Sequence, residues 1–154
     1  MSKLRELSRE LGAEIIYFIP SENDIALIDD IKGLYLPEYD IIYIRDDLTI
    51  IEQENVILHE LGHCYCGHTH YNCHSKMFGS KQEAQADRFM VVHRFNEWLS
   101  KWDFAPEPNE INISQFMDAY ELNNKLKWIC ELVIEEYTAC LLYTSDAADE
   151  ARSV

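Results

Sequence analysis

The chain has 154 residues, of which 47% are hydrophobic and 27% are charged, the balance of a globular protein with one domain and a modest core. Its net charge of -15 disfavours direct binding to nucleic acid or to an anionic membrane, and it suits a basic partner. No apolar run approaches the length of a membrane span, and the N-terminus lacks a signal-peptide core. We therefore expect a cytoplasmic protein that contains reduced cysteines rather than disulfides.

The N-terminal third of the chain predicts one helix followed by three short strands. Leu4, Leu7 and Leu11 recur on one side of an amphipathic helix, and Gly12 is a typical helix stop. Runs of β-branched and aromatic residues after it are typical of strands. The expected elements are a helix over 2–12, strands over 13–20, 33–37 and 40–45, and turns over 21–24 and 37–39.

The remainder of the chain is predicted to be mostly helical and has no internal repeat. Thr49 and Glu52 form a capping-box pattern that opens the first of these helices, and two prolines near residue 107 break the chain. The expected elements are a helix over 49–67, a loop over 67–79, and helices over 80–101, 114–122 and 125–139.

The helix over 49–67 contains an H-E-x-x-H motif, His59-Glu60-Leu61-Gly62-His63. Residues four apart share a helix face, so both imidazoles can bind one metal ion, while Glu60 lies about 100° away around the axis. Zinc held in this way lowers the pKa of a bound water to about 7, and Glu60 is expected to take its proton as general base. The alternative is an exposed helix with two solvated histidines, which the apolar residues around the motif disfavour.

A third metal ligand is expected about twenty residues downstream, in the segment Glu83-Ala84-Gln85-Ala86-Asp87. Glu83 would complete a His-His-Glu site, and Asp87, four residues later, would accept a hydrogen bond from the second ring nitrogen of a ligand histidine. Two alternatives stay open at this point. Ser80 and Glu83 also fit a capping box, in which Glu83 serves only the helix N-terminus, and Asp87 could be a solvated helix residue.

A second group of potential ligands crowds just after the motif: Cys64, Cys66, His68, His70, Cys73 and His74. Their spacing matches no common zinc module, so we expect Cys64 to be buried on the helix and the later residues to lie in an exposed loop. One of His70, Tyr71 or His74 could line the cleft and stabilise an oxyanion, but the pattern does not choose among them.

The run Val56–His63, followed by Glu83–Phe89, resembles the ImmA/IrrE family of metallopeptidases. The resemblance covers about residues 33–121 and departs from the family pattern at Gln85, where the family has glutamate, and at Met90, where it has alanine. It implies a protein encoded on a prophage or another mobile element, beside a helix-turn-helix transcriptional repressor. It also implies that the enzyme relieves repression by cleaving that repressor.

The C-terminal segment over 140–154 changes composition abruptly and looks like the translation of a sequencing-library transposon adapter. We therefore expect the domain to span 1–139 and the tail over 140–154 to be an artefact. The alternative is a genuine polar tail.

Together these observations predict a single α+β domain of zincin type, with a small sheet beside the motif helix and a gluzincin-like zinc site. The predicted function is a hydrolase, a zinc metallopeptidase that cuts a repressor protein. The main alternative is a non-catalytic metal-binding regulatory or sensor module, and a DNA-binding regulator is disfavoured by the charge. Structural zinc sites usually have four protein ligands, whereas three are identifiable here, which favours catalysis.

Overall fold

The computed structural model describes residues 2–20, 31–68 and 76–152, which divide into two compact units at the boundary between His93 and Arg94. The expected turn over 21–24 lies outside the described residues. In the described part of the chain, no helix has the length and apolar character needed to cross a membrane.

The first unit is built from helices packed beside a small sheet, so the fold class is α+β, as the sequence predicts. Its elements are α1 (Ser2–Leu11), β1 (Glu14–Phe18), β2 (Gly33–Leu36), β3 (Ile41–Arg45), α2 (Ile50–Tyr65) and the first part of α3 (Lys76–Ser100). Gly12 adopts a φ of 76°, a conformation that suits glycine, and ends α1 where expected.

The sheet has three strands in the order β1-β3-β2. β3 pairs in parallel with β1 and antiparallel with β2, with Tyr35 opposite Ile42. Ile42 and Ile44 of this central strand are fully buried. β2 is left at one edge of the sheet.

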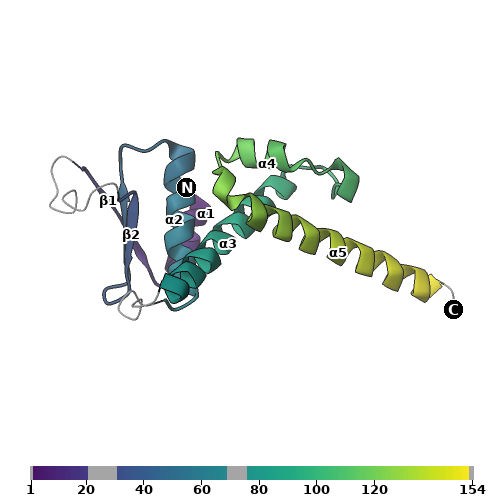
Figure 1. Cartoon of the computed structure of the whole chain (residues 1–154), viewed down its shortest axis with the longest axis horizontal. Coiled ribbons are helices and arrows are strands. Elements are labelled where there is room, and N and C mark those ends of the chain that lie inside the picture. The colour runs from purple at the N-terminus through teal and green to yellow at the C-terminus, as the bar shows by residue number, and fades with distance from the viewer. Residues whose placement is uncertain (1, 21–30, 69–75, 153–154) are drawn as a thin grey trace. The chain divides into compact units, whose positions relative to one another are not determined.

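Helix α2 packs against β2 and β3, and α1 lies along α2 (Figure 1). The buried core between these elements contains Ala13, Tyr35, Ile42, Ile44, Ile57 and Leu61. Leu4, Leu7 and Leu11 of α1 pack against this core, as the periodicity of the sequence predicts. The burial of Ile57 and Leu61 fixes the face of α2 that meets the sheet, and the histidines of the motif lie off that face.

The N-terminus of α2 is capped by Thr49, whose side chain accepts a hydrogen bond from the backbone N–H of Glu52 at 3.2 Å. The Glu52 carboxylate accepts a hydrogen bond from Lys32 at 2.5 Å. The helix therefore begins where the capping pattern predicts.

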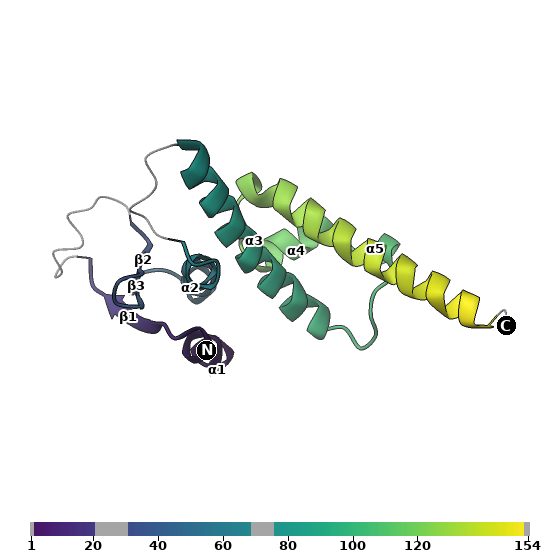
Figure 2. The same cartoon turned by 90° about the horizontal axis from the view of Figure 1, so that it is seen from below.

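α2 lies between the sheet and the first part of α3 (Figure 2). The two helices cross closely at Gly62, where an added Cβ would lie 2.9 Å from the α-carbon of Ala86. α3 begins at Lys76, so the prediction of a loop as far as residue 79 was wrong for its last four residues. Residues 69–75 lie outside the described part of the chain.

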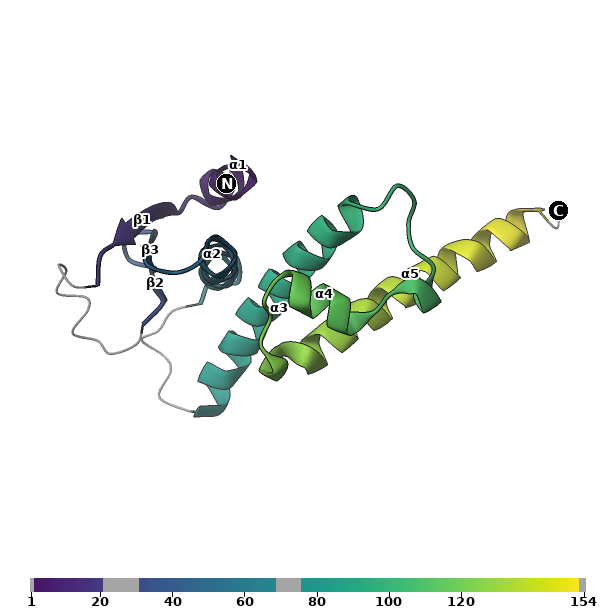
Figure 3. The same cartoon turned by 90° about the horizontal axis from the view of Figure 1, so that it is seen from above.

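The second unit contains the end of α3, a 3-10 helix η3 (Pro108–Glu110), α4 (Ile113–Ala119), a 3-10 helix η4 (Asn124–Leu126) and α5 (Lys127–Arg152). α4 lies beside α5 (Figure 3). Aromatic rings form the core: Phe95 packs edge-on against Phe116 and Tyr137, with ring centroids 5.4 and 5.5 Å away.

α5 runs to Arg152 without a break, whereas the sequence predicted that it ends near Ala139. The alanine, leucine and glutamate residues beyond position 139 favour a helix whatever their origin. The proposed boundary between 1–139 and 140–154 therefore stays a prediction.

Candidate metal centre

Helices α2 and α3 bring His59, His63 and Glu83 together, and these three side chains are a group that could hold a metal ion. The two oxygens of Glu83 lie 3.0 Å from Nε2 of His59 and 3.0 Å from Nε2 of His63. The two Nε2 atoms are 3.2 Å apart. His63 is almost fully buried, whereas the Glu83 side chain is 56% exposed, so the group opens to solvent on the Glu83 side.

The spacing of these donor atoms fits a small tetrahedral ion. With zinc–nitrogen bonds of about 2.0–2.1 Å, neighbouring ligand atoms lie about 3.3 Å apart, close to the separations seen here. Two imidazoles and one carboxylate are also a donor set that zinc accepts in catalytic sites. The residues present therefore fit a zinc-sized ion and leave a fourth position without a ligand among the described side chains.

Asp87 orients the ring of His59 through the nitrogen that does not face Glu83. Its Oδ1 lies 2.7 Å from Nδ1 of that ring. This is the contact expected of a carboxylate that orients a metal-ligating imidazole. Asp87 is thus not an isolated solvated residue.

The ring of His63 is held by His68, a contact that the sequence analysis missed. Nδ1 of His68 lies 2.8 Å from Nδ1 of His63, and Nε2 of His68 lies 2.7 Å from Oε1 of Gln85. His68 is buried, so the expectation that it lies in an exposed loop was wrong. The local signal was Gly67, whose φ of 67° turns the chain back after α2.

Gly67 and His68 complete a Schellman motif at the end of α2. The Gly67 N–H donates to the Cys64 carbonyl at 3.1 Å, and the His68 N–H donates to the His63 carbonyl at 3.0 Å. These bonds return the chain over the last turn of the helix, so the His68 ring lies over the His63 ring.

Glu60 lies on the same helix as the two histidines but turns toward β2. It is buried, and the backbone of Tyr35 hydrogen-bonds its carboxylate. Burial raises the pKa of Glu60, and the nearby His59 and His63 partly oppose that rise. A carboxylate whose pKa is moved toward neutrality is suited to exchange protons at physiological pH.

The carboxylates around His59 hold its imidazolium form. Burial lowers the pKa of His59, but hydrogen bonds to Asp87 and Glu83 outweigh burial and raise the pKa to about 10. The same contacts, first with His59 and then with His63, hold the pKa of Glu83 well below its ordinary value. The negative charge of these carboxylates would also attract a divalent cation to this site.

The start of α3 and the burial of His63 exclude two of the alternatives that the sequence left open. Ser80 lies inside α3, which begins at Lys76, so Glu83 does not belong to a capping box at the start of that helix. His63 is buried, and this excludes two solvated histidines on an exposed helix.

The Cys–His cluster after the motif does not form a second metal-binding group within the described residues. Cys64 is half-buried and contacts the Leu11 carbonyl at 3.6 Å, whereas Cys66 is exposed. The described cysteines, Cys64, Cys66, Cys130 and Cys140, form no disulfide with one another. The candidates for oxyanion stabilisation, His70, Tyr71 and His74, lie outside the described residues, as does Cys73.

Residues 10–122 match the family model of peptidase M78, which is described as the IrrE N-terminal-like domain. The chain belongs to this family. The match covers both motif-bearing helices and extends further toward the N-terminus than the resemblance seen in the sequence, so that it includes the whole three-stranded sheet. No curated protein matches the chain.

Membership of the peptidase M78 family assigns the chain to a group of metallopeptidases. The His59–His63–Glu83 group lies within the matched residues, in agreement with that assignment.

Proposed function

We propose that this protein is a zinc-dependent endopeptidase. The observation that carries the proposal is the convergence of His59, His63 and Glu83 at metal-ligand spacing, with the buried carboxylate of Glu60 next to the first histidine. In a chain of the peptidase M78 family, this arrangement is best explained by hydrolysis of a peptide bond.

His59, His63 and Glu83 would hold the zinc ion through two Nε2 atoms and one carboxylate. Bound zinc would act as a Lewis acid that lowers the pKa of a water molecule and polarises a carbonyl. Asp87 keeps a hydrogen on Nδ1 of His59, which leaves the lone pair of Nε2 directed at the metal position.

Glu60 would act as the general base. Its carboxylate accepts the proton of the attacking water and then passes that proton to the amine that leaves. The hydrogen bond from the Tyr35 backbone fixes the carboxylate against β2, and burial excludes bulk water from it. Both effects keep the base in one orientation for the transfer.

The proposed substrate is a helix-turn-helix transcriptional repressor encoded by the same prophage or mobile element, in a cytoplasmic setting. One feature supports it indirectly. The net charge of -15 would attract a basic DNA-binding protein.

A cleavage assay tests the proposal directly. The purified protein is loaded with zinc and incubated with the repressor encoded next to it, and the fragments are read by mass spectrometry. We expect cuts at one or a few positions that disappear when a chelator is added. An intact repressor beside efficient cleavage of unrelated unfolded proteins would contradict the regulatory role and leave a general zinc peptidase.

A hydroxamate inhibitor separates catalysis from a non-catalytic metal-binding or sensor role. Three protein ligands leave one coordination position for the inhibitor, so the zinc-loaded protein should bind it. A zinc-loaded protein that does not bind hydroxamate has a closed site, and this would contradict the enzymatic proposal.

A further inference from the structure

His63, a proposed zinc ligand, begins a chain of contacts to two further side chains, His68 and Gln85, which the proposed mechanism does not use. Its Nδ1 contacts Nδ1 of His68 at 2.8 Å, and Nε2 of His68 contacts Oε1 of Gln85 at 2.7 Å. His63 and His68 are both buried, and Gln85 reaches them from the exposed side of α3. The chain therefore joins a proposed metal ligand on α2 to a surface residue of α3.

Hydrogen bonds along this chain can run in only one direction if His63 binds a metal. An imidazole that offers its Nε2 lone pair to a metal carries its hydrogen on Nδ1. The Nδ1–H of His63 then donates to Nδ1 of His68, which must be the nitrogen without a hydrogen. His68 therefore carries its hydrogen on Nε2 and donates it to the Gln85 oxygen, which can only accept.

The opposite direction would disable the ligand. If Gln85 presented its amide N–H to His68, both hydrogen bonds would reverse, and a hydrogen would lie on Nε2 of His63. That hydrogen would point at Nε2 of His59 and at Glu83, in the space a metal ion needs. With its amide oxygen facing His68 at 2.7 Å, Gln85 supports the metal-binding form of His63.

We infer that Gln85 is a positioning residue that acts through His68 to hold His63 in its metal-binding tautomer. His59 has the same support from Asp87 directly, so each histidine of the motif is oriented from α3. The two supports differ in charge: Asp87 is a carboxylate, and Gln85 is a neutral acceptor that adds no negative charge beside Glu60 and Glu83. The inference rests on the proposed metal site.

Zinc affinity and ring tautomers test this inference without an activity assay. Zinc affinity is measured by competition with a chromophoric chelator for the unsubstituted protein, Gln85→Leu and Gln85→Glu. Loss of an outer hydrogen-bond partner typically lowers metal affinity by about 10- to 100-fold, and we expect this for Gln85→Leu. Gln85→Glu keeps an acceptor at the same place and should restore the affinity of the unsubstituted protein or exceed it.

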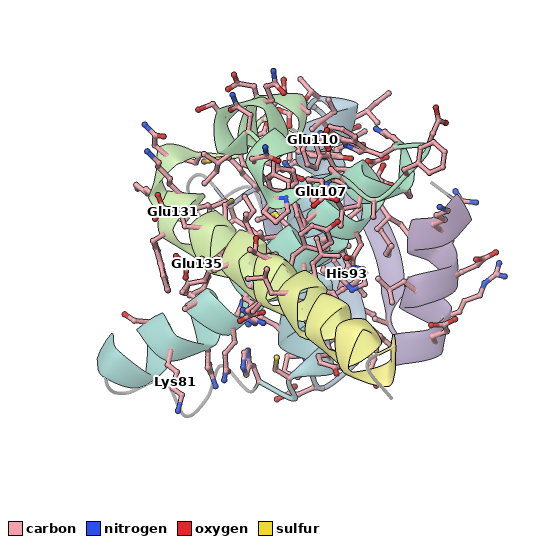
Figure 4. The ribbon with its side chains drawn as sticks, turned by 90° about the vertical axis from the view of Figure 1, so that its right-hand side faces the viewer. Lys81, His93, Glu107, Glu110, Glu131 and Glu135 are labelled. Carbon is pink, nitrogen blue, oxygen red and sulfur yellow. The ribbon has the colours of Figure 1, made fainter. Side chains whose placement is uncertain are left out.

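Lys81→Leu is the matched control, because Lys81 is exposed on α3 and projects outward in Figure 4. It introduces the same apolar side chain on the same helix and should leave zinc affinity unchanged. Equal losses of zinc affinity in Lys81→Leu and Gln85→Leu would show that a general change in α3 causes the effect. This result would overturn the inference.

Nitrogen-15 NMR of the zinc-loaded, unsubstituted protein reads the tautomers directly, so the test stands even if a variant fails to fold. We expect the hydrogen of His63 on Nδ1 and that of His68 on Nε2. A hydrogen on Nδ1 of His68, or full zinc affinity in Gln85→Leu, overturns the role of Gln85 while the metal site stands. If the unsubstituted protein binds no zinc, both the role of Gln85 and the proposed metal site are overturned.

Discussion

Glu60 and Glu83 are both glutamates of the candidate centre, but their surroundings give them different proposed roles. Glu60 is buried against β2, and its oxygens are absent from the metal-binding group, whereas both oxygens of Glu83 face the histidine Nε2 atoms. We therefore expect Glu60→Gln to keep one zinc per chain while peptide hydrolysis falls by roughly 10²- to 10⁴-fold.

Glu83→Ala is the matched comparison, and it should retain its fold because the side chain is half exposed, but lose stoichiometric zinc. Elemental analysis gives the zinc content, and a peptide assay gives the rate. Full activity of Glu60→Gln, or zinc retained in Glu83→Ala, would show that the roles are assigned wrongly.

The raised pKa of His59 predicts how the stability of the metal-free protein depends on pH. The folded state favours the imidazolium, with a pKa of about 10 against an ordinary value of 6.5. Its contribution to stability is therefore complete below about pH 6.5 and is lost as the pH rises through about 10. The melting temperature of chelator-treated protein should fall across this range.

Two comparisons isolate His59 in that experiment. Asp87→Asn removes the carboxylate behind the ring, so the fall in melting temperature should become shallower. Zinc requires the neutral ring and displaces the proton, so zinc-loaded protein should show less of the fall. An equally steep fall in Asp87→Asn would show that other groups cause it.

The motif residues could be predicted from the sequence because helical periodicity alone brings His59 and His63 together. Glu83 and Asp87 required a second helix of the right orientation, which the sequence supported only by spacing and resemblance. His68 could not be placed from periodicity, because its position depends on the left-handed conformation of Gly67 and on its contact with Gln85 of α3. A periodic pattern carries no information about either.

At the scale of elements, the contact between α2 and α3 sets the distance from the histidines to Glu83. A methyl group on Gly62 would lie 2.9 Å from the α-carbon and 3.0 Å from the carbonyl oxygen of Ala86, and backbone atoms cannot move aside alone. Gly62→Ala should therefore separate the helices, lower stability by about 1–3 kcal/mol and weaken zinc binding.

The Gly62→Ala prediction is measured by thermal unfolding and by chelator competition. Ser80→Ala, at an exposed position of α3, is the control for an added helix-former and should change neither quantity. Unchanged zinc affinity in a destabilised Gly62→Ala would mean that the helix spacing does not control the site.

The end of α5 gives a second prediction at this scale. Strand and helix types were largely predictable from periodicity, but the end of α5 was not, since helix-favouring residues continue past Ala139. If the segment over 140–154 has no evolved packing partner, its deletion should leave the melting temperature and the zinc content unchanged.

A slightly longer deletion is the control for the tail. Tyr137 packs against Phe95 and donates a hydrogen bond to the Pro106 carbonyl at 3.2 Å. Removal of residues 137–154 should therefore lower stability by roughly 1–3 kcal/mol. A comparable loss on deleting only 140–154 would show that this segment belongs to the fold.

At the scale of the whole molecule, charge is the feature that bears on partner choice. Exposed acidic side chains occur well away from the metal centre in sequence; in the second unit, Figure 4 shows Glu107 and Glu110 near η3 and Glu131 and Glu135 on α5. These residues take no part in the proposed chemistry. A surface of this kind affects how fast a charged partner arrives rather than how it is cut.

The last prediction therefore concerns the rate of association with the proposed repressor, and it rests on the proposed function. Electrostatic steering of a basic partner can raise the association rate constant by about 10- to 10³-fold, and salt removes the gain because the Debye length shrinks to about 3 Å at 1 M. We expect stopped-flow association to slow by at least about tenfold between low and high salt, with the dissociation rate nearly constant. Glu131→Gln with Glu135→Gln should slow association at low salt and leave zinc content and the rate of cutting a short neutral peptide unchanged. An association rate that is insensitive to salt would remove charge as an argument for a basic DNA-binding substrate, whatever the outcome of the cleavage assay.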